Sequence, residues 1–295
     1  MATLRELKGR IGSVASSEKI TGAMKMISSA KMHKAEQALK RLLPFRRQVE
    51  TIIGSLVTAD TEFSSPLLDE RQVKSVALVV FGSDDGLCGA YNVNIFKQLL
   101  ERISDCRNQY GEDIEFTIYP VGAKMLKAVQ KIADSRIKVA ESEGVDSKTT
   151  GDGVKAFMDM LRDGFVSGQY DKVDALYMSF KSVSRQRPKF DQLLPVSQEA
   201  FAAGKGEVKP VVRPYIFEPD ASSIFNSVLP MYLMSVMQDI FTENRASEQA
   251  ARVMAMQSAN DNAKKLLEQL RLEYNKLRQQ SITTELLDIL GGQIR

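Results

Sequence analysis

The sequence is poor in the residues that build metal sites and nucleophilic active sites. Its 295 residues contain no tryptophan, a single histidine, His33, and two cysteines, Cys88 and Cys106. The scarcity of these residues excludes an ordinary zinc site and a histidine-based catalytic triad. Two cysteines also cannot form a disulfide framework, which favours a reducing compartment. No apolar run approaches the ~20 residues that a membrane-spanning helix needs.

Charge is distributed unevenly along the chain. The net charge is +3, yet residues 1–50 contain eleven Lys and Arg against four Asp and Glu. A basic segment of this kind is typical of proteins that bind nucleic acid, an anionic membrane or an acidic protein surface. It is equally typical of a solvated helix face, so the charge pattern alone leaves these alternatives open.

Both ends of the chain have the periodicity of very long helices. Apolar residues recur at alternating steps of three and four, which predicts helices over residues 1–58 and 221–295. No Gly or Pro interrupts the second helix between Pro230 and Gly291. The expected seam positions are Leu4, Leu7, Ile11, Val14, Ala35, Ala38, Leu42, Phe45, Val49, Ile52 and Leu56, then Leu233, Val236, Ile240, Ser247, Ala251, Met254, Ser258, Ala263, Leu267, Leu270, Tyr274 and Leu277.

The two long helices are expected to pair with each other. Helices of this length need a partner for their apolar seams, and two helices that leave one compact domain on the same side pair most simply as an antiparallel coiled coil. Small side chains allow a close approach of the two backbones. The small residues in question are Gly12, Ala15, Gly22, Ala23 and Ala30 on the first helix, and Ala251, Ala255, Ala259 and Ala263 on the second.

The second helix is expected to be longer than the first. With about 54 and about 70 residues, ~15 residues of the second helix extend past the end of the first. This overhang is the C-terminal segment, and an exposed apolar helix tip implies that another protein covers it. Its apolar residues are Ile282, Leu286, Leu287, Ile289 and Leu290.

Residues 74–217 alternate between strand and helix patterns. Such an alternation predicts a largely parallel sheet with helices on its faces, and therefore a Rossmann-like α/β domain flanked by the two long helices. The expected strands are 74–82, 113–122, 136–140 and 173–183, with later strands or arms at 189–196 and 208–218, and the expected helices are about 91–110, 122–133 and 152–166.

The loop after the first strand, GSDDGLCG at 82–89, has the general shape of a phosphate-binding loop but not its chemistry. Its glycines do not follow the dinucleotide-binding or P-loop spacing, and Asp84 and Asp85 put negative charge where a phosphate would sit. We interpret the loop as a tight turn that needs positive φ. Cys88 and Cys106 are expected in the core, and His33 on the surface of a basic helix. The sequence predicts no catalytic, cofactor or metal site.

Four segments carry a resemblance to a known family. They are KITGAMKMISSAKMHKA at 19–35, DGLCGAYN at 85–92, ENRASEQAARVMAMQSANDNA at 243–263 and YNKLRQQSITTELLDILGG at 274–292. Because they occur in order from one end of the chain to the other, the whole chain resembles the gamma subunit of F-type ATP synthase.

The resemblance implies a rotor shaft in the central stalk, one copy per complex. In this family the paired helices stand inside a ring of three alpha and three beta subunits, and the α/β domain lies against the epsilon subunit and the membrane rotor (c) ring. Rotation couples proton transport to ATP synthesis or hydrolysis in the alpha/beta ring. The resemblance further implies a non-catalytic subunit, without cofactor or nucleic acid, peripheral to the cytoplasmic face of the bacterial inner membrane.

The resemblance also implies which residues contact the alpha/beta ring. Met24 and Lys25 match positions that face an acidic loop of a beta subunit. The other expected contacts are Arg252, Gln279, Thr283, Leu286 and Leu290. Two departures put local contacts in question: Asp85 stands where the family usually has a basic residue, and Leu287 where many members have a polar one.

Two other classes compete with the rotor interpretation. One is a basic coiled-coil protein that binds DNA or a membrane through the first helix, although Glu6, Glu18, Glu36 and Glu50 interrupt its basic face. The other is a nucleotide enzyme built on the α/β domain. Salt-dependent retention on DNA would indicate the first, and binding of ATP or NAD by the purified chain would indicate the second.

Overall fold

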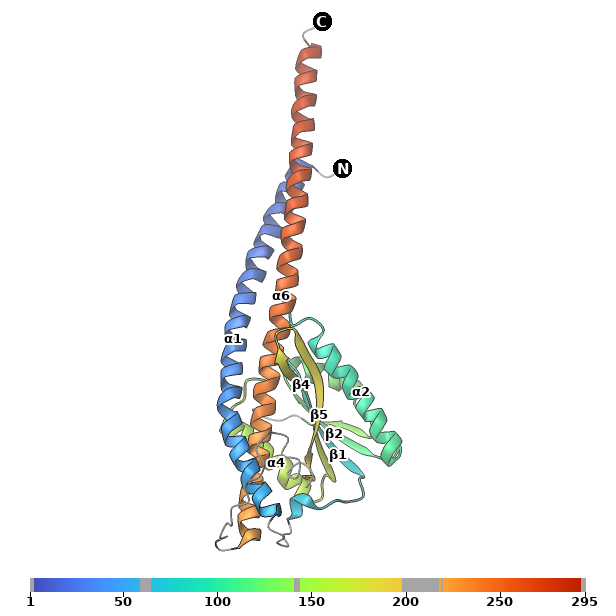
Figure 1. The fold of residues 1–295 in the computed structure, drawn as a ribbon. Coiled ribbons are helices and arrows are strands. Elements are labelled where there is room, and N and C mark those ends of the chain that lie inside the picture. Colours follow the sequence, from blue (N-terminus) through green and yellow to red (C-terminus); the bar gives the residue numbers. More distant parts are fainter. Residues whose placement is uncertain (1–2, 59–64, 141–143, 198–217, 219, 293–295) are drawn as a thin grey trace.

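Two long helices and a smaller α/β domain make up the fold (Figure 1). The computed structural model describes residues 3–58, 65–140, 144–197, 218 and 220–292. Helix α1 spans Leu4–Thr58 with 55 residues, and helix α6 spans Ala221–Gly292 with 72 residues. The helices lie side by side, and the α/β domain packs against the part of the pair that is farther from the C-terminus (Figure 1). The predicted fold class is confirmed.

Helices α1 and α6 run antiparallel. The side-chain amide of Asn260 donates a hydrogen bond to the Glu18 carbonyl oxygen at 2.7 Å, and Arg46 pairs with Asp239 at 3.1 Å. Residue numbers therefore rise along one helix as they fall along the other. The two helices form a coiled coil, although the whole α/β domain lies between them in the sequence.

The seam of α1 differs from the prediction in its second half. One unbroken series of three- and four-residue steps runs through its buried and half-buried residues. Phe45 and Ile52 lie outside this series, with exposed fractions of 49% and 38%, so their predicted seam positions were wrong. The series is Leu4, Leu7, Ile11, Val14, Glu18, Thr21, Lys25, Ser28, Met32, Ala35, Leu39, Leu42, Arg46, Val49, Ile53 and Leu56.

The seam of α6 also needs a correction in its middle. Met254 and Ser258, which were predicted to face α1, are exposed. Ala251 packs instead against the core between the sheet and its outer helices. The seam that is observed consists of Val253, Met256, Asn260, Ala263, Leu267, Leu270, Tyr274 and Leu277.

Small residues contribute less to the pairing of the helices than predicted. At Gly22 an added Cβ would lie 3.4 Å from the side-chain amide of Asn260, which is an ordinary contact across the seam. An added Cβ at Gly12 would meet nothing within 4 Å, and Ala23 and Ala30 are exposed. The prediction of close backbone approach was therefore wrong at these three positions.

Among the described residues the sheet has five strands, in the order β3-β2-β1-β4-β5. The first four strands in this order are mutually parallel, and β5 runs antiparallel to β4 at one edge. In the register, Val79 lies opposite Tyr119 on one side and Ala175 on the other. The strands are β1 Ser75–Phe81, β2 Glu115–Val121, β3 Ile137–Val139, β4 Lys172–Ser182 and β5 Arg185–Leu194.

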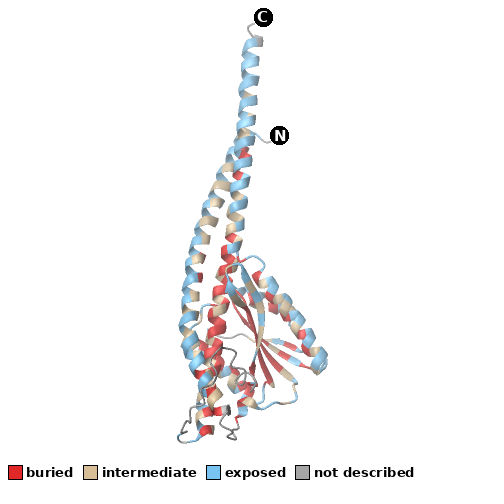
Figure 2. Ribbon diagram, in the orientation of Figure 1, coloured by how far each residue is buried: buried red, intermediate tan, exposed pale blue. Residues whose placement is uncertain are grey.

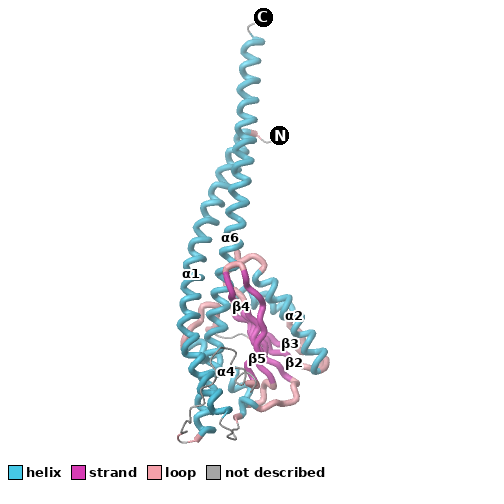
Figure 3. The backbone as a smooth tube through the Cα atoms, viewed as in Figure 1, coloured by secondary structure: helices cyan, strands magenta, loops and turns pink. Residues whose placement is uncertain are grey.

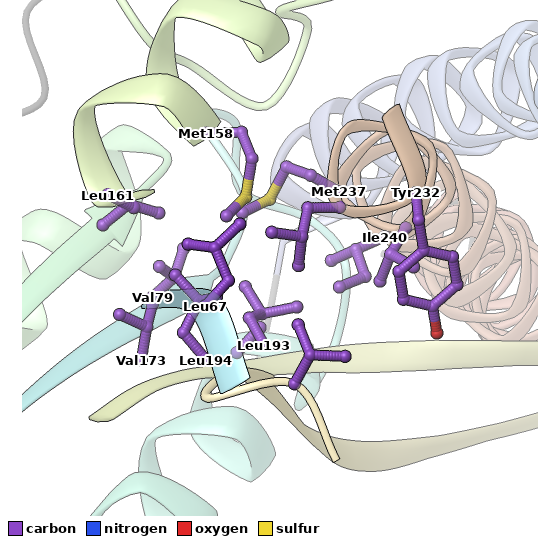
Figure 4. Packing of buried hydrophobic residues seen from close by; sticks show 14 of the residues in the cluster. Leu67, Val79, Met158, Leu161, Val173, Leu193, Leu194, Tyr232, Met237 and Ile240 are labelled. Carbon is purple, nitrogen blue, oxygen red and sulfur yellow. The ribbon is translucent and has the colours of Figure 1, made fainter. Parts of the chain in front are cut away.

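Helices cover both faces of the sheet, so that it forms the middle layer of the domain (Figure 3). On one face, α4, α6 and the end of α1 enclose a core that includes Val79, Met158 and Met237 (Figure 4). On the other face, Ile95 of α2 and Met125 of α3 belong to a second core. The remaining helices are η1 Pro66–Leu68, α2 Tyr91–Tyr110, α3 Ala123–Val129, η2 Gln130–Ile132 and α4 Asp152–Val166.

The end of the domain is only partly described. The strand predicted at 189–196 is the second arm of a hairpin, because β5 begins at Arg185 and follows β4 after a short turn. The strand predicted at 208–218 falls almost entirely on residues 198–217, outside the described part of the chain. The predicted boundary of the domain at residue 217 therefore stays a prediction.

Asp174 is a charged side chain in the centre of the domain. It is fully buried on β4, with Arg102 at 3.6 Å and Lys172 at 3.7 Å. Burial raises the pKa of the Asp174 carboxyl to about 6, while the two cations act in the opposite direction. The folded chain therefore holds this proton more tightly than the unfolded chain.

This difference in pKa predicts a pH dependence of stability. As the pH falls from 7 to 5, protonation of Asp174 should stabilise the folded chain by about 1 kcal/mol, and the gain is lost as the pH rises through the folded-state pKa. Asp174→Asn removes the titration. Urea unfolding of both chains across this pH range should show the wild type gaining stability relative to the variant toward pH 5. Parallel curves would contradict the prediction.

Candidate functional site

The C-terminal part of α6 extends beyond the end of α1 (Figure 1). Toward this end of the pair, the last well-buried residues are Leu7 on α1 and Leu267 and Leu270 on α6. From residue 282 to residue 290 every side chain of α6 is exposed (Figure 2). We call residues 282–290 the overhang. Its geometry agrees with the length difference that the sequence predicted.

The overhang is strongly apolar for an exposed helix. The exposed fractions are 48% for Ile282, 55% for Leu286, 63% for Leu287, 63% for Ile289 and 60% for Leu290. Scattered exposed leucines are normal, but a contiguous apolar helix tip marks an interaction surface. Within the described chain no other element covers it. The overhang is therefore a candidate docking surface.

The structure brings four of the predicted contact residues together on this tip. Gln279, Thr283, Leu286 and Leu290 follow steps of four, three and four residues, so they form one stripe along α6. All four are exposed, and the Thr283 hydroxyl donates to the Gln279 carbonyl oxygen at 2.9 Å. The stripe joins polar residues near the coiled coil to apolar residues at the tip.

Met24 and Lys25 lie far from the overhang, in the middle of α1. Both are half-buried beside α6. A shallow hollow of the coiled coil opens here, with Glu18, Lys25 and Lys264 in its lining. Here the seam is polar, because Asn260 donates to the Glu18 carbonyl oxygen and to the Thr21 hydroxyl. The coiled coil thus presents basic groups midway along its length, next to the exposed Met26 (69%), Ile20 (59%) and Ile27 (56%).

Arg252 lies on α6, but its side chain is engaged within the chain. The residue is only 6% exposed, and its guanidinium points into the chain. It pairs with Glu248 at 2.7 Å and donates to the carbonyl oxygens of Asp85 and Gly86, each at 3.2 Å. An arginine with these internal partners cannot also serve as an outward contact in this geometry. The structure thus places Arg252 inside the chain, and its predicted contact with the ring stays a prediction.

The residues that Arg252 holds belong to the loop after β1. This loop, residues 82–90, makes the predicted turn through positive φ, at Leu87 (65°) and Gly89 (61°). The Asp84 carboxylate accepts hydrogen bonds from the Ala123 N–H at 3.1 Å and the Ser147 hydroxyl at 2.6 Å. A carboxylate thus occupies the position at the start of α3 where an anion would be attracted.

The remaining side chains with potential chemistry have structural surroundings. Cys88 and Cys106 are buried, as predicted, and burial raises the pKa of the Cys106 thiol. His33 is exposed on α1, with its Nδ1 3.6 Å from Glu36. Among the described residues no group of three His, Cys, Asp or Glu side chains could hold a metal ion. No described helix has both the length and the apolar character to cross a membrane.

Sequence reasoning missed the buried polar contact between α6 and this loop. Asn244, Glu248 and Arg252 recur every four residues, and their exposed fractions are 1%, 3% and 6%. Burial raises the pKa of the Glu248 carboxyl, and Arg252 opposes this shift. Three large polar residues at helical spacing in a segment without Gly or Pro were the available signal. We call Asn244, Glu248 and Arg252, together with loop 82–90 and Tyr91, the junction.

Comparison with known proteins identifies the family. The family model described as ATP synthase matches residues 3–293. The ATP synthase gamma chain of Bacteroides fragilis strain ATCC 25285 is 41% identical, and that of Cupriavidus pinatubonensis is 34% identical. The first alignment covers all of both chains, and the second covers 99% of each.

Solved structures agree with this match. A central-stalk chain of the Tetrahymena thermophila mitochondrial ATP synthase has 25% identity and a TM-score of 0.58, over 81% of this chain and 99% of that chain. A chain of the Euglena gracilis mitochondrial ATP synthase shares the fold, with 20% identity and a TM-score of 0.64 over 98% and 93%. The chain belongs to the family of ATP synthase gamma chains, the rotor subunit of the central stalk.

Proposed function

We propose that the coiled coil of α1 and α6 turns inside a ring of alpha and beta subunits, and that the α/β domain lies outside it, against the epsilon subunit and the membrane c-ring. One copy of the chain serves each complex. The structures that resemble this chain are described as central stalk, F1 and c-ring, which supports these partners. The bacterial relatives support a peripheral position on the cytoplasmic face of the inner membrane.

The observation that carries this proposal is the overhang. An apolar helix tip of this length, five of whose apolar side chains are between 48% and 63% exposed, is costly in water unless a partner surrounds it. The apolar side chains lie on one side of the helix, with Thr284, Glu285 and Asp288 on the other, so the partner must bury the apolar side of the tip. A DNA- or membrane-binding coiled coil does not account for this tip, and the family assignment gives that alternative no support.

We further propose how the ring is contacted. Gln279, Thr283, Leu286 and Leu290 meet it from one stripe of the overhang and its base. Met24 and Lys25 meet it midway along the coiled coil, where the basic side chains suit an acidic loop. Arg252 is excluded from this set because its guanidinium is engaged inside the chain.

The chain is proposed to contribute no catalytic group of its own. At the start of α3, where a helix N-terminus would attract a phosphate, the Asp84 carboxylate accepts the Ala123 N–H. A nucleotide phosphate there would meet a like charge. Binding and hydrolysis of nucleotides therefore belong to the alpha and beta subunits, and this chain supplies the asymmetric shaft that drives their conformational changes.

Removal of residues 286–295 tests the proposed role of the overhang. The isolated chain should lose only the helical signal of the removed residues and should keep its unfolding midpoint, because residues 286–290 make no buried contact within it. The complex with the alpha/beta ring should dissociate about 10–100 times faster, since the lost apolar burial is worth a few kcal/mol by area before ordering costs are subtracted. The measurement is complex lifetime by size-exclusion chromatography after dilution.

A full-length variant serves as the matched control. Leu286→Gln with Leu290→Gln keeps the length of the helix but removes two apolar side chains, and should shorten the lifetime of the complex by a smaller factor. If the truncated chain unfolded on its own, the tip would belong to the core of the chain. An unchanged lifetime would show that the ring does not hold the tip.

A further inference from the structure

The junction is built from one face of α6 and the loop that follows the central strand β1. Asn244, Glu248 and Arg252 occupy successive turns of α6 and are nearly fully buried. On the other side, loop 82–90 joins β1 to α2. Polar side chains are costly to bury unless each is paired in a defined geometry. The polar contacts of the junction therefore specify one position of α6 relative to the sheet. Apolar packing alone would not specify it.

Asn244 forms the first half of the junction. Its side-chain amide nitrogen donates to the Gly82 carbonyl oxygen at 3.1 Å. The Tyr91 hydroxyl, at the first residue of α2, lies 2.5 Å from the Asn244 Oδ1 and 3.2 Å from its carbonyl oxygen. One asparagine thus binds the residue after β1 and the first residue of α2. It fixes α6 against both elements at once.

Arg252 forms the second half, two turns farther along α6. Its Nε donates to the Gly86 carbonyl oxygen and its Nη2 to that of Asp85, while Glu248 balances the charge. A guanidinium has the planar fork that two adjacent carbonyl oxygens require. Buried ion pairs contribute little net stability but fix geometry, so this pair orients the fork toward the loop.

The loop in turn is tied to the rest of the α/β domain. The Asn92 side chain accepts from the Ser83 N–H and donates to the Ser83 hydroxyl oxygen at 3.1 and 2.8 Å. Asp84 binds Ala123 at the start of α3 and Ser147. A force applied to the loop is therefore shared by α2, α3 and the carboxyl edge of the sheet.

We propose that the junction is the place where rotation passes between the α/β domain and α6, and that Tyr91, Asn244 and Arg252 are its positioning residues. This inference rests on the proposed function. Phe241 packs on Phe81 below the junction, but apolar contacts are non-directional and permit sliding. Hydrogen bonds to fixed backbone carbonyls are directional, so they resist rotation of α6 about its own axis relative to the sheet.

The test uses the assembled ATP synthase in membrane vesicles. Arg252→Lys keeps the charge beside Glu248 but loses the fork, and Tyr91→Phe removes one hydroxyl. For each single variant and for the double variant, both proton pumping and ATP hydrolysis are measured and normalised to the amount of assembled complex, while the opposing proton gradient is increased. The number of protons pumped per ATP hydrolysed should be lower than in the wild type, and should fall further as the gradient grows. Amide exchange in loop 82–90 should rise about tenfold or more.

Two controls separate a coupling role from a structural one. Arg162→Lys alters an ion pair of the same 2.7 Å length inside α4, away from the junction, and should leave the ratio unchanged. The second control restores the junction with a disulfide. A Cβ at Gly89 would lie 3.7 Å from the Ala255 Cβ, within disulfide reach. Gly89→Cys and Ala255→Cys are introduced into the double variant together with Cys88→Ala. Formation of the disulfide should restore the number of protons pumped per ATP toward the wild-type value, and reduction of the disulfide should abolish this rescue.

The outcomes distinguish this proposal from the proposed function. If complexes with the wild-type chain neither assemble nor pump, the proposed function fails. If they pump and the variants keep the wild-type ratio at every gradient, the junction proposal is overturned while the proposed function stands. A ratio that falls but is not restored by the disulfide also overturns it, because the loss then does not arise from movement at the junction.

Discussion

Replacing Phe241 by alanine is expected to lower the free energy of unfolding of the isolated chain by about 3–5 kcal/mol. Phe241 on α6 is 1% exposed, and its ring meets Phe81 edge-on at 4.8 Å and Phe157 at 6.3 Å. It thus fills the space between α6, β1 and α4. The substitution loses the apolar burial, leaves a cavity and removes two aromatic contacts. Urea unfolding followed by circular dichroism measures the loss.

Phe45→Ala is the matched control. Phe45 lies on α1 and is 49% exposed, so its removal should change the unfolding free energy by no more than about 0.5 kcal/mol. A comparable loss in the two variants would show that Phe241 is not a central contact between the long helix and the sheet. The pair of variants also tests the corrected seam, because Phe45 was predicted from the sequence to face α6.

Most of the fold could be predicted because its elements have strong and unbroken patterns. The helix expected at about 91–110 is α2, Tyr91–Tyr110, and the helix expected at 152–166 is α4, Asp152–Val166. The four parallel strands are short apolar runs between turn residues, and the long helices repeat their seam over many heptads. Local propensity, periodicity and turn chemistry agree in these segments, which is the condition under which a sequence specifies its elements.

The seam of α1 shows where periodicity becomes ambiguous. Four large apolar residues fall within two helical turns of α1, so more than one series of three- and four-residue steps fits them. They are Leu39, Leu42, Leu43 and Phe45. A choice of Ala38 instead of Leu39 moves every second position by one residue, which put Phe45 and Ile52 in the seam and left the positions between them unchanged. The structure selects Leu39 and Ile53 because the end of α1 must also face the sheet.

The junction could not be predicted because its partners are distant in sequence. Arg252 lies 166 residues from Gly86, and what it binds there is a backbone carbonyl, which every residue possesses. No side-chain pattern in loop 82–90 indicates such a contact. The resemblance matched Arg252 to a shaft position that meets the ring, whereas its burial against the loop depends on how the whole domain docks on α6.

The overhang presents the opposite case, since its exposure follows from length alone. Once α1 has 55 residues and α6 has 72, part of α6 must extend past its partner whatever the details of the seam. The apolar residues at the tip then have no neighbour within the described chain. Length and composition are read directly from a sequence, which is why this surface was predicted correctly and the junction was not.

Replacing Gly122 by alanine is expected to destabilise the chain by about 3 kcal/mol or more. Gly122 precedes α3 with a φ of 105°, and an added Cβ would lie 2.9 Å from the carbonyl carbon and oxygen of Ser83. Both clashing atoms are backbone, so no side chain can rotate away. The Ser83 carbonyl also accepts the Lys124 N–H at 3.0 Å, which would be displaced.

Gly111→Ala separates the clash from the backbone strain. Gly111 has nearly the same φ, 103°, but an added Cβ there meets nothing within 4 Å, so this variant should lose only the ~1 kcal/mol or so of unfavourable backbone conformation. Because Ser83 lies in loop 82–90, the Gly122 variant should also raise amide exchange in that loop, and the Gly111 variant should not. Equal destabilisation by the two variants would mean that strain at positive φ, and not the close approach of β2 to the loop, requires glycine at position 122. In that case the end of β2 would not hold the loop that meets Arg252.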